Sequence, residues 1–442
     1  GSQGTFVAMN NIVSQSVLQW VVIAYGLLLG GFLLLGGRMA DLLGRRRILL
    51  TGMTVFSAAS LVAGIAQSSA VLIAARGVQG FGAALITPAA LSIVAVTFAE
   101  GQERNRALGL LGAIGGGAGS VGVIASGLPT DGPGWRWVFF INVPVGIVLI
   151  ALATVFLASD PGERGTRTFD VGGATSVTGG LLLLVYGLNR GAEDGWTSIR
   201  TLLLFAAAAL LLASFVRIEA RSPAPLVPAA AVKHRTLVAA NLSAFFAFSG
   251  LFSFIFLGSL LMQQVLGYSP TKTGVAWLAT SATAFAASAA AGARLVALVG
   301  VRRLLVSGLT LLAIGMLWLT RVPADAGYVT DLLPAFLLAG VGVGLCAPSA
   351  QIGALSGVSE STSGLASGLV ETMREIGGAA GVAAVSTALV SRAGVDGFRA
   401  AFAVICVAAA LGAVIAAVAF PRGVRPAEQP TIDAQPQVGT EP

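Results

Sequence analysis

The feature that most constrains this chain is a succession of long apolar runs separated by short polar stretches. A bilayer core is about 30 Å thick, and a helix needs about 20 apolar residues to cross it. The 442 residues are 56% hydrophobic and 10% charged, with a mean hydropathy of +0.88, which exceeds what a soluble core requires. We therefore expect an all-α polytopic membrane protein. The thirteen expected spans are residues 17–36, 48–66, 71–98, 107–128, 138–158, 171–188, 200–216, 237–266, 273–291, 304–320, 331–356, 363–390 and 400–420.

Basic residues concentrate in alternate loops between these runs. If the loop containing Arg45 is cytoplasmic, seventeen of the 26 Lys and Arg residues fall in inside loops, seven in outside loops and two, Arg76 and Arg374, within spans. Cytoplasmic loops are enriched in Lys and Arg, so this asymmetry predicts the orientation. It places the tail, 421–442, in the cytoplasm, where its Pro, Gln and Glu content predicts disorder. The net charge of +7 belongs to these loops, and we expect no nucleic-acid partner.

An internal repeat relates two of the basic loops. The segments GGRMADLLGRRRILLTG (36–52) and GARLVALVGVRRLLVSG (292–308) agree at eight of seventeen positions. Both lie in loops of the same orientation, which indicates two parallel halves. The offset of 256 residues corresponds to eight spans, so two spans are predicted to be inserted between two six-helix bundles. The expected divisions are 1–158 for the N-terminal bundle without its first span, 159–235 for the two inserted spans and a cytoplasmic linker, 236–420 for the C-terminal bundle and 421–442 for the tail.

Several motifs in a fixed order point to a family. The segment GGRMADLLGRRR (36–47) resembles the signature loop between the second and third spans of the major facilitator superfamily, and LIAARGVQGFGAA (72–84) resembles its fourth-span motif. The segments SVLQWVVIAYGL, GWRWVFFINVPVG, QQVLGYSPTKTG and GLASGLVETMREIGGAAGVA further resemble the fourteen-span drug:proton antiporters of that superfamily. The resemblance covers nearly the whole chain and implies the major facilitator fold, with two inserted helices.

The sequence departs from this family pattern at two places. A first span with an acidic residue normally precedes SVLQWVV, and we expect that this span is missing, together with an acid near Arg76. The fifth-span motif normally has Gly-Pro followed by Gly-Gly, whereas here Gly122-Val123 and Ser126-Gly127 remove the proline kink. The glycines that remain for close helix approach are Gly112, Gly116, Gly119 and Gly122.

The crowded charges of the 36–47 loop have two interpretations. The glycines permit close backbone approach, and the arginines hold the loop in the cytoplasm, which alone would make it an anchor. Asp41 can accept hydrogen bonds from a helix N-terminus or from arginines across the interface between the halves, which would make it a conformational latch. The second repeat keeps arginines but has Ala297 in place of the acid, which favours the latch. The candidate latch residues are Gly37, Asp41, Gly44, Arg45 and Arg46.

Two carboxylates stand out by their depth in the membrane. Of nineteen acids, seventeen lie in loops, at span ends or in the tail, which leaves Glu371 and Glu375. They share one helix face with Arg374, and ionisable residues inside spans favour a functional hypothesis. One proton or one cationic substrate would neutralise the net negative charge of the trio. We expect these three residues and Arg76 to serve proton coupling; a static buried ion pair that braces the helix is the alternative.

The expected span 237–266 suggests a substrate cavity. Its six phenylalanines go around the helix, so some must face lipid or protein core. A subset that lines an apolar cavity would suit amphiphilic or aromatic compounds. The candidate cavity residues are Asn241, Phe245, Phe252, Gln263 and, on the fourth span, Gln79.

Together these features predict a proton-coupled exporter of hydrophobic or cationic drugs or antibiotics that works by alternating access. A lipid or metabolite transporter on the same fold and a non-transporting membrane sensor or scaffold are the alternatives. We expect no enzyme activity, cofactor or metal, because no nucleophile, base and metal constellation is present. Only two of the 26 basic residues are lysines, which is typical of a GC-rich bacterial sequence. We therefore expect a bacterial protein, located in the cytoplasmic membrane. We also expect it to be a monomer.

Overall fold

The structure is a computed structural model that describes residues 15–115, 136–158, 170–222, 225–227, 234–359 and 362–420. Every regular element within these ranges is a helix. The expected tail and the expected fifth-span glycines after Gly112 lie outside the described residues. An all-helical chain satisfies its backbone hydrogen bonds within each segment, as a protein in lipid must.

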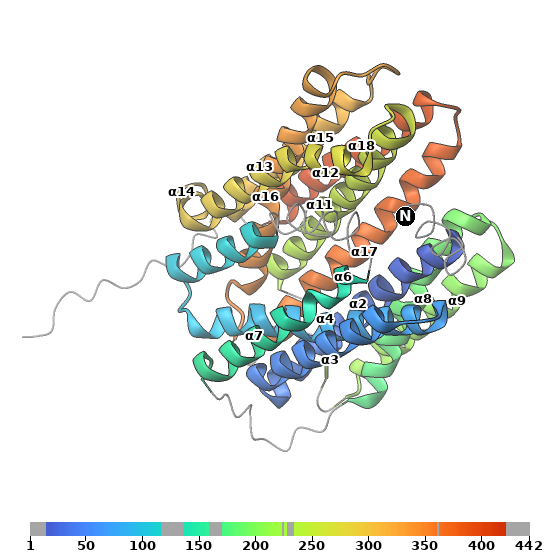
Figure 1. The fold of residues 1–442 in the computed structure, drawn as a ribbon. Coiled ribbons are helices and arrows are strands. Elements are labelled where there is room, and N and C mark those ends of the chain that lie inside the picture. Colours follow the sequence, from blue (N-terminus) through green and yellow to red (C-terminus); the bar gives the residue numbers. More distant parts are fainter. Residues whose placement is uncertain are drawn as a thin grey trace, which may run out of the picture.

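Long helices that pack side by side form the N-terminal half (Figure 1). They are α2 (Gln15–Leu43), α3 (Arg45–Ile65), α4 (Ser69–Thr97), the helical residues 102–115, α6 (Trp137–Phe140) and α7 (Asn142–Phe156). Helix α4 lies against both α2 and α3, and α7 covers α3. Helix α7 exposes most of its apolar surface, as expected for a lipid-facing helix.

Two helices separate the halves, α8 (Val171–Asp194) and α9 (Ile199–Glu219). Helix α8 packs against α2 and also against α17, whereas the main contacts of α9 are with α8. The turn between them contributes the Trp196 indole N–H, which donates to the Thr387 hydroxyl of α17 at 2.7 Å. The pair is therefore attached along the side of the molecule where the two halves meet.

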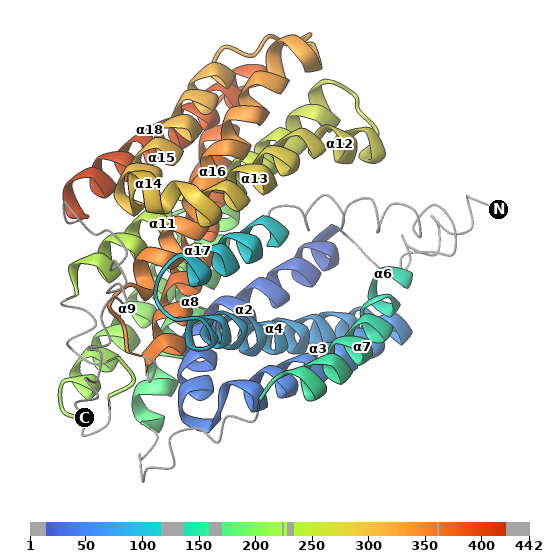
Figure 2. The ribbon, with the colours of Figure 1, turned by 90° about the vertical axis from the view of Figure 1, so that its left-hand side faces the viewer.

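The C-terminal half contains the remaining helices, which Figure 2 shows as a second group. They are α11 (Arg235–Leu260), η1 (Leu261–Val265), α12 (Pro270–Ala276), α13 (Leu278–Ala290), η2 (Ala291–Leu295), α14 (Val296–Val299), α15 (Val301–Leu319), η3 (Tyr328–Leu332), α16 (Leu333–Leu355), α17 (Ser363–Val390) and α18 (Val395–Ala419). The strongest packing joins α11 to α17, α15 to α16, and α13 to α16.

Eleven helices among the described residues are long and apolar enough to cross a membrane. Each corresponds to one of the expected spans. Helix α17 matches the expected span 363–390 but carries three charged residues, and the expected span 107–128 is described only up to residue 115. The all-α polytopic fold is therefore confirmed.

The two copies of the repeat begin a helix in the same way. Gly44 (φ 97°) ends the break between α2 and α3, and Gly300 (φ 82°) ends the break between α14 and α15. These positive φ values favour glycine, which explains the match at this position. The helices that follow start with the paired arginines of the repeat.

The halves meet along two seams at the end of the molecule that carries Arg45, Arg217 and Arg302, which we call the basic end. In the first seam, α2 packs on α17. In the second, the helical residues 102–115 lie on η2, and a Cβ at Gly109 would lie 2.5 Å from the Gly292 Cα. Gly112 also belongs to the second seam, because its Cβ would contact the Ser288 side chain at 2.6 Å. Close approach through small residues thus joins both pairs of helices.

Candidate functional site

The first seam contains a carboxylate from one half bound to a helix N-terminus of the other. Asp41 lies near the end of α2, is only 5% exposed, and accepts hydrogen bonds from the backbone N–H groups of Gly364 (3.0 Å) and Leu365 (2.9 Å). These N–H groups lie in the first turn of α17, where no intrahelical acceptor exists. The N-cap residue Thr362 makes no side-chain cap, so Asp41 takes over that role across the seam.

A hydrogen-bonded chain extends this contact to three helices of the N-terminal half. Arg45, the first residue of α3, lies 3.7 Å from Asp41 and donates through Nε to the Ser92 hydroxyl at 2.9 Å. The Ser92 hydroxyl on α4 is 2.7 Å from the Ser363 hydroxyl on α17. We call Asp41, Arg45, Ser92 and Ser363 the latch.

The other candidate residues of the 36–47 loop have different positions. Gly37 lies directly against α17, since a Cβ there would collide with the Gly364 carbonyl oxygen. Gly44 provides the helix break described above. Arg46 stays within its own half, where it donates to the Thr154 carbonyl near the end of α7 at 2.6 Å.

The second repeat reproduces the Arg46 contact but not the latch. Arg302 corresponds to Arg46 and donates through Nε to the Ala417 carbonyl near the end of α18 at 2.9 Å. A cation at the C-terminal carbonyls of a helix is favourable, so each half ties its own last helix. The positions equivalent to Asp41 and Arg45 are Ala297 and Val301, which cannot form the latch.

Helix α17 carries the acidic cluster about two turns beyond the latch. Glu371 is buried and forms an ion pair with Arg374. The Arg374 guanidinium also lies over the Phe248 ring of α11, 3.9 Å from its centroid. Two interactions therefore hold Arg374, one ionic and one cation–π.

Glu375 differs from Glu371 in having no ion-pair partner among the described residues. It faces α2, where a Cβ at Gly30 would lie 3.5 Å from the Glu375 Cβ. The carboxylate is half-buried beside the first seam. Any relative movement of α2 and α17 would change its surroundings, which suits a group that binds and releases a proton.

Arg76 on α4 is held by neutral groups. Its guanidinium donates to the Val21 carbonyl (3.1 Å) and to the Gln79 Oε1 (2.8 Å), and it lies over the Tyr25 ring, 4.3 Å from the centroid. No carboxylate of the described chain lies within 4 Å of it. Tyr25 interacts electrostatically with Glu375 as well as with Arg76.

Two of the expected cavity residues lie apart from the other three in the structure. Gln79 is 1% exposed and, besides binding Arg76, donates to the Ser60 hydroxyl at 2.5 Å, so it positions Arg76 inside the bundle. Gln263 is exposed in η1, 22 residues along the helix from Asn241, which corresponds to about 33 Å. One small molecule cannot contact both ends of this helix.

The remaining expected cavity residues lie on the part of α11 that packs against α17. A Cβ at Gly377 would collide with the Phe245 carbonyl oxygen, and one at Gly378 would collide with the Phe252 ring. Asn241 donates to the Leu237 carbonyl at 2.8 Å, and its side-chain oxygen is buried without a hydrogen-bond partner. Gly377 thus lets the α11 backbone approach α17, and Gly378 leaves room for the Phe252 ring.

Sequence reasoning missed Tyr25 and the contact of Phe248 with Arg374. Tyr25 is one polar group in an apolar run, and Phe248 is one of six phenylalanines on its helix, so neither stood out. Among the described residues, no three His, Cys, Asp or Glu side chains gather as metal ligands.

Two repeated helical halves that meet at a seam with buried charge define the architecture of a secondary transporter. The family model for the Major Facilitator Superfamily matches residues 3–381 and 237–440. The chain belongs to this superfamily, as its motifs indicated. Both the two-bundle fold and the family resemblance are thereby confirmed.

Several curated proteins from bacteria are similar to this chain. The puromycin resistance protein pur8 of Streptomyces alboniger is 37% identical over 85% of this chain and 75% of its own length. The cephamycin export protein CmcT of Amycolatopsis lactamdurans is 36% identical over 84% of this chain and 76% of its own length. The multidrug resistance protein Stp of Mycobacterium tuberculosis is 33% identical over 85% of this chain and 70% of its own length.

Solved structures support the fold at lower identity. The human organic anion transporter MFSD10 superimposes with a TM-score of 0.65 at 19% identity, covering 94% of this chain and 88% of that one. The proton:xylose symporter XylE superimposes with a TM-score of 0.61 at 16% identity, covering 93% of this chain and 90% of that one. At these identities the likeness concerns the fold alone.

Proposed function

We propose that this protein exports hydrophobic or cationic drugs or antibiotics in exchange for protons by alternating access. Its membership of the superfamily and its similarity to relatives named for puromycin resistance, cephamycin export and multidrug resistance support an export role. The proposed setting is the cytoplasmic membrane of a bacterium, with protein monomers in the bilayer. We retain the division into two bundles, 1–158 and 236–420, with the helices of 159–235 inserted between them.

The observation that carries the proton coupling is the unpaired Glu375 beside the first seam. Glu371 and Arg374 compensate each other, so the cluster as a whole carries one net negative charge when ionised. A charge at membrane depth is costly, and neutralising it stabilises the site. A proton and a cationic substrate can each supply the missing positive charge, and competition between them gives exchange.

The latch couples this chemistry to the movement of the halves. The basic end is the proposed cytoplasmic face, because Lys and Arg mark that side. With Asp41 bound to the first turn of α17, the halves are closed there. Opening towards the cytoplasm requires Asp41 to leave Gly364 and Leu365, and the same movement separates Glu375 from Gly30. Proton binding and latch opening therefore involve the same pair of helices.

Substrate-dependent proton release by the purified protein tests this proposal. Glu375→Gln should fold normally but lose most of the proton release, and proton-driven export from liposomes should fall with it. Glu371→Gln should also weaken export, and because it leaves Arg374 without its ionic partner it should lower the melting temperature as well. The matched control is Asp396→Asn, an exposed acid paired with Arg399 at the start of α18, which should leave proton release unchanged.

Different outcomes favour the alternatives. Normal proton release with a lowered melting temperature in both glutamate variants would reduce the cluster to a structural brace. Proton-driven movement of lipids or metabolites, without movement of drugs, would indicate a different substrate class. The absence of any substrate-dependent proton flux in the unmodified protein, across a broad compound screen, would favour a sensor or scaffold.

A further inference from the structure

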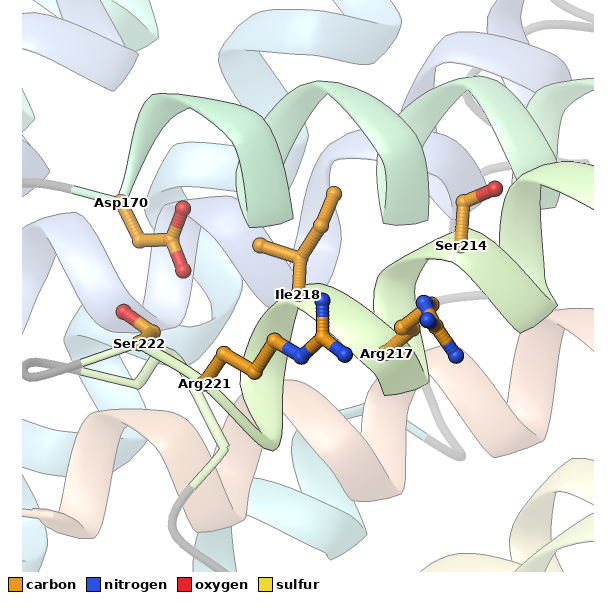
Figure 3. Close-up of a pocket in the computed structure, with 6 residues that line it drawn as sticks. All are labelled: Asp170, Ser214, Arg217, Ile218, Arg221 and Ser222. Atoms are coloured by element: carbon orange, nitrogen blue, oxygen red, sulfur yellow. The ribbon is translucent and has the colours of Figure 1, made fainter.

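A pocket of about 600 Å³ lies at the basic end between the start of α8 and the end of α9 (Figure 3). It is far from the latch helices in the sequence and plays no part in the proposed exchange. Figure 3 shows Asp170 and Ser222 at one end, Ser214 and Arg217 at the other, and Ile218 between them. The pocket is lined by Asp170, Ser214, Arg217, Ile218, Arg221 and Ser222.

The two arginines of this pocket are adjacent and uncompensated. Arg217 and Arg221 are four residues apart on α9, so they share one helix face. Both are exposed, and neither has a carboxylate within 4 Å in the described chain. At the opposite end of the same helix pair, by contrast, Asp194 lies 3.8 Å from Arg190 and 3.7 Å from Arg200. Among the described residues, the arginines of the basic pocket therefore lack the ion pairs that Arg190 and Arg200 form.

An exposed apolar row on α9 leads directly to these arginines. Leu203, Leu210 and Arg217 are spaced by seven residues and so fall on nearly the same line along the helix. Leu203 is 64% exposed and Leu210 69%. The row is about 21 Å long, comparable to the hydrocarbon thickness of one leaflet plus its interface. An apolar row that ends in two cations fits a molecule with an acyl chain and an anionic head.

The carboxylate of the pocket adds a hydrogen-bond acceptor. One oxygen of Asp170, Oδ1, accepts the Gly173 N–H at 2.7 Å and so caps α8. The other oxygen, Oδ2, is buried and has no hydrogen-bond partner. A buried acceptor without a partner is unfavourable, and a hydroxyl of a bound molecule would satisfy it.

We propose that this pocket binds the head group of an anionic phospholipid of the phosphatidylglycerol class. Arg217 and Arg221 bind the phosphate, since paired guanidinium groups match its oxygens. The head-group hydroxyls reach towards Asp170, and an acyl chain lies along Leu203 and Leu210. Basic pockets at the membrane surface recognise lipid head groups in this manner.

The test compares lipid binding by the full chain in nanodiscs, using native mass spectrometry to count retained lipids and a titration for affinity. Phosphatidylglycerol should be retained over phosphatidylcholine. The double variant Arg217→Gln/Arg221→Gln should bind phosphatidylglycerol about 30-fold more weakly, about fivefold for each arginine. Arg217→Lys/Arg221→Lys keeps both charges but loses the guanidinium geometry, so its affinity should lie between those of the unmodified protein and the glutamine variant.

Two controls separate this site from general attraction to the membrane. Arg47→Gln/Arg303→Gln removes the same charge from exposed positions at the basic end and should leave the affinity unchanged. Asp170→Asn keeps an acceptor for the α8 cap but should reduce the preference for phosphatidylglycerol over phosphatidic acid, which has no head-group hydroxyls beyond its phosphate. Equal losses of phosphatidylglycerol affinity in Arg217→Gln/Arg221→Gln and in Arg47→Gln/Arg303→Gln would overturn the proposal. Competition by millimolar inorganic phosphate as effective as that by the lipid would also overturn it, because the site would then be one for a soluble anion.

Discussion

Replacing Asp41 with asparagine should shift the balance between the two arrangements of the halves. The carboxylate accepts one N–H with each oxygen, at 3.0 and 2.9 Å, whereas the amide keeps one acceptor and turns an N–H₂ donor towards the second N–H. One hydrogen bond to a charged group is lost, about 1.5–3 kcal/mol, and the attraction to the helix dipole falls. A net loss of about 2 kcal/mol corresponds to a shift of about 30-fold in the equilibrium away from the closed basic end.

Spin labels across the seam measure this shift. Labels at Arg47 on α3 and Leu298 on α14, both exposed, report the separation of the halves at the basic end in a background with Cys346 and Cys406 replaced by alanine. Asp41→Asn should add or enlarge a long-distance population and slow export per folded molecule, while membrane insertion and abundance remain near normal.

Arg46→Gln is the matched control, because it removes a charge five residues away without touching α17. Its hydrogen bond goes to the Thr154 carbonyl of its own half, so the distance distribution should not change. An unchanged distribution and normal export in Asp41→Asn would refute the latch and leave the 36–47 loop as a topological anchor.

Three further predictions follow from the contacts of the seam and the bundles. Gly37→Val should abolish export and widen the same spin-label distance, because its side chain collides with α17. Arg302→Gln should lower the unfolding free energy by about 1–2 kcal/mol, seen as a lower melting temperature, with export per folded molecule unchanged, since it loses the bond to the Ala417 carbonyl. Phe248→Leu removes about 1 kcal/mol of cation–π attraction from Arg374 and should reduce substrate-dependent proton release.

The fold and a contact of Asp41 between the halves could be anticipated because each has a local signal in the sequence, whereas Ser92 and Ser363 had none. Apolar runs of membrane-spanning length predicted the helices, and the glycine–arginine repeat predicted the parallel halves. Asp41 was identified by chemistry: a carboxylate in a basic loop, absent from the second repeat at Ala297, has few roles other than binding cations or backbone N–H groups. In the structure, Asp41 binds the backbone N–H groups in the first turn of α17. The spacing of residues in the sequence could not identify this helix as the partner of Asp41.

Other parts of the site depend on acceptors that carry no sequence signal. The partners of Arg46 and Arg302 are backbone carbonyls near the ends of α7 and α18, and any residue could provide them. For that reason the sequence grouped Arg46 with the candidate latch residues and gave Arg302 no role beyond setting the topology, and neither carbonyl partner was predicted. Gln79 was assigned to a cavity by its polarity, but polarity alone does not distinguish a residue that faces a substrate from one that holds Arg76.

The helix length could have excluded one assignment in advance. Asn241 and Gln263 are 22 residues apart, and a rise of about 1.5 Å per residue already separates them by more than the length of a small compound. The aromatic contacts near Arg374 could not be found in this way, because six phenylalanines cover every direction around α11 and only the packing against α17 selects among them.

The unequal seams have a consequence for how the halves move. Each half fastens its own last helix with the corresponding arginine, Arg46 or Arg302, and we expect each half to move as a unit. Between them, the first seam contains a charged carboxylate, while the second, where Gly109 lies on Gly292, is closed by backbone packing and by neutral hydrogen bonds such as that from Ser288 to the Gly109 carbonyl. Salt and pH act on the first and hardly on the second. We therefore expect the ionic strength and pH at the basic end to change how often the halves separate at the first seam, where Asp41 lies, and to have little effect at the second seam.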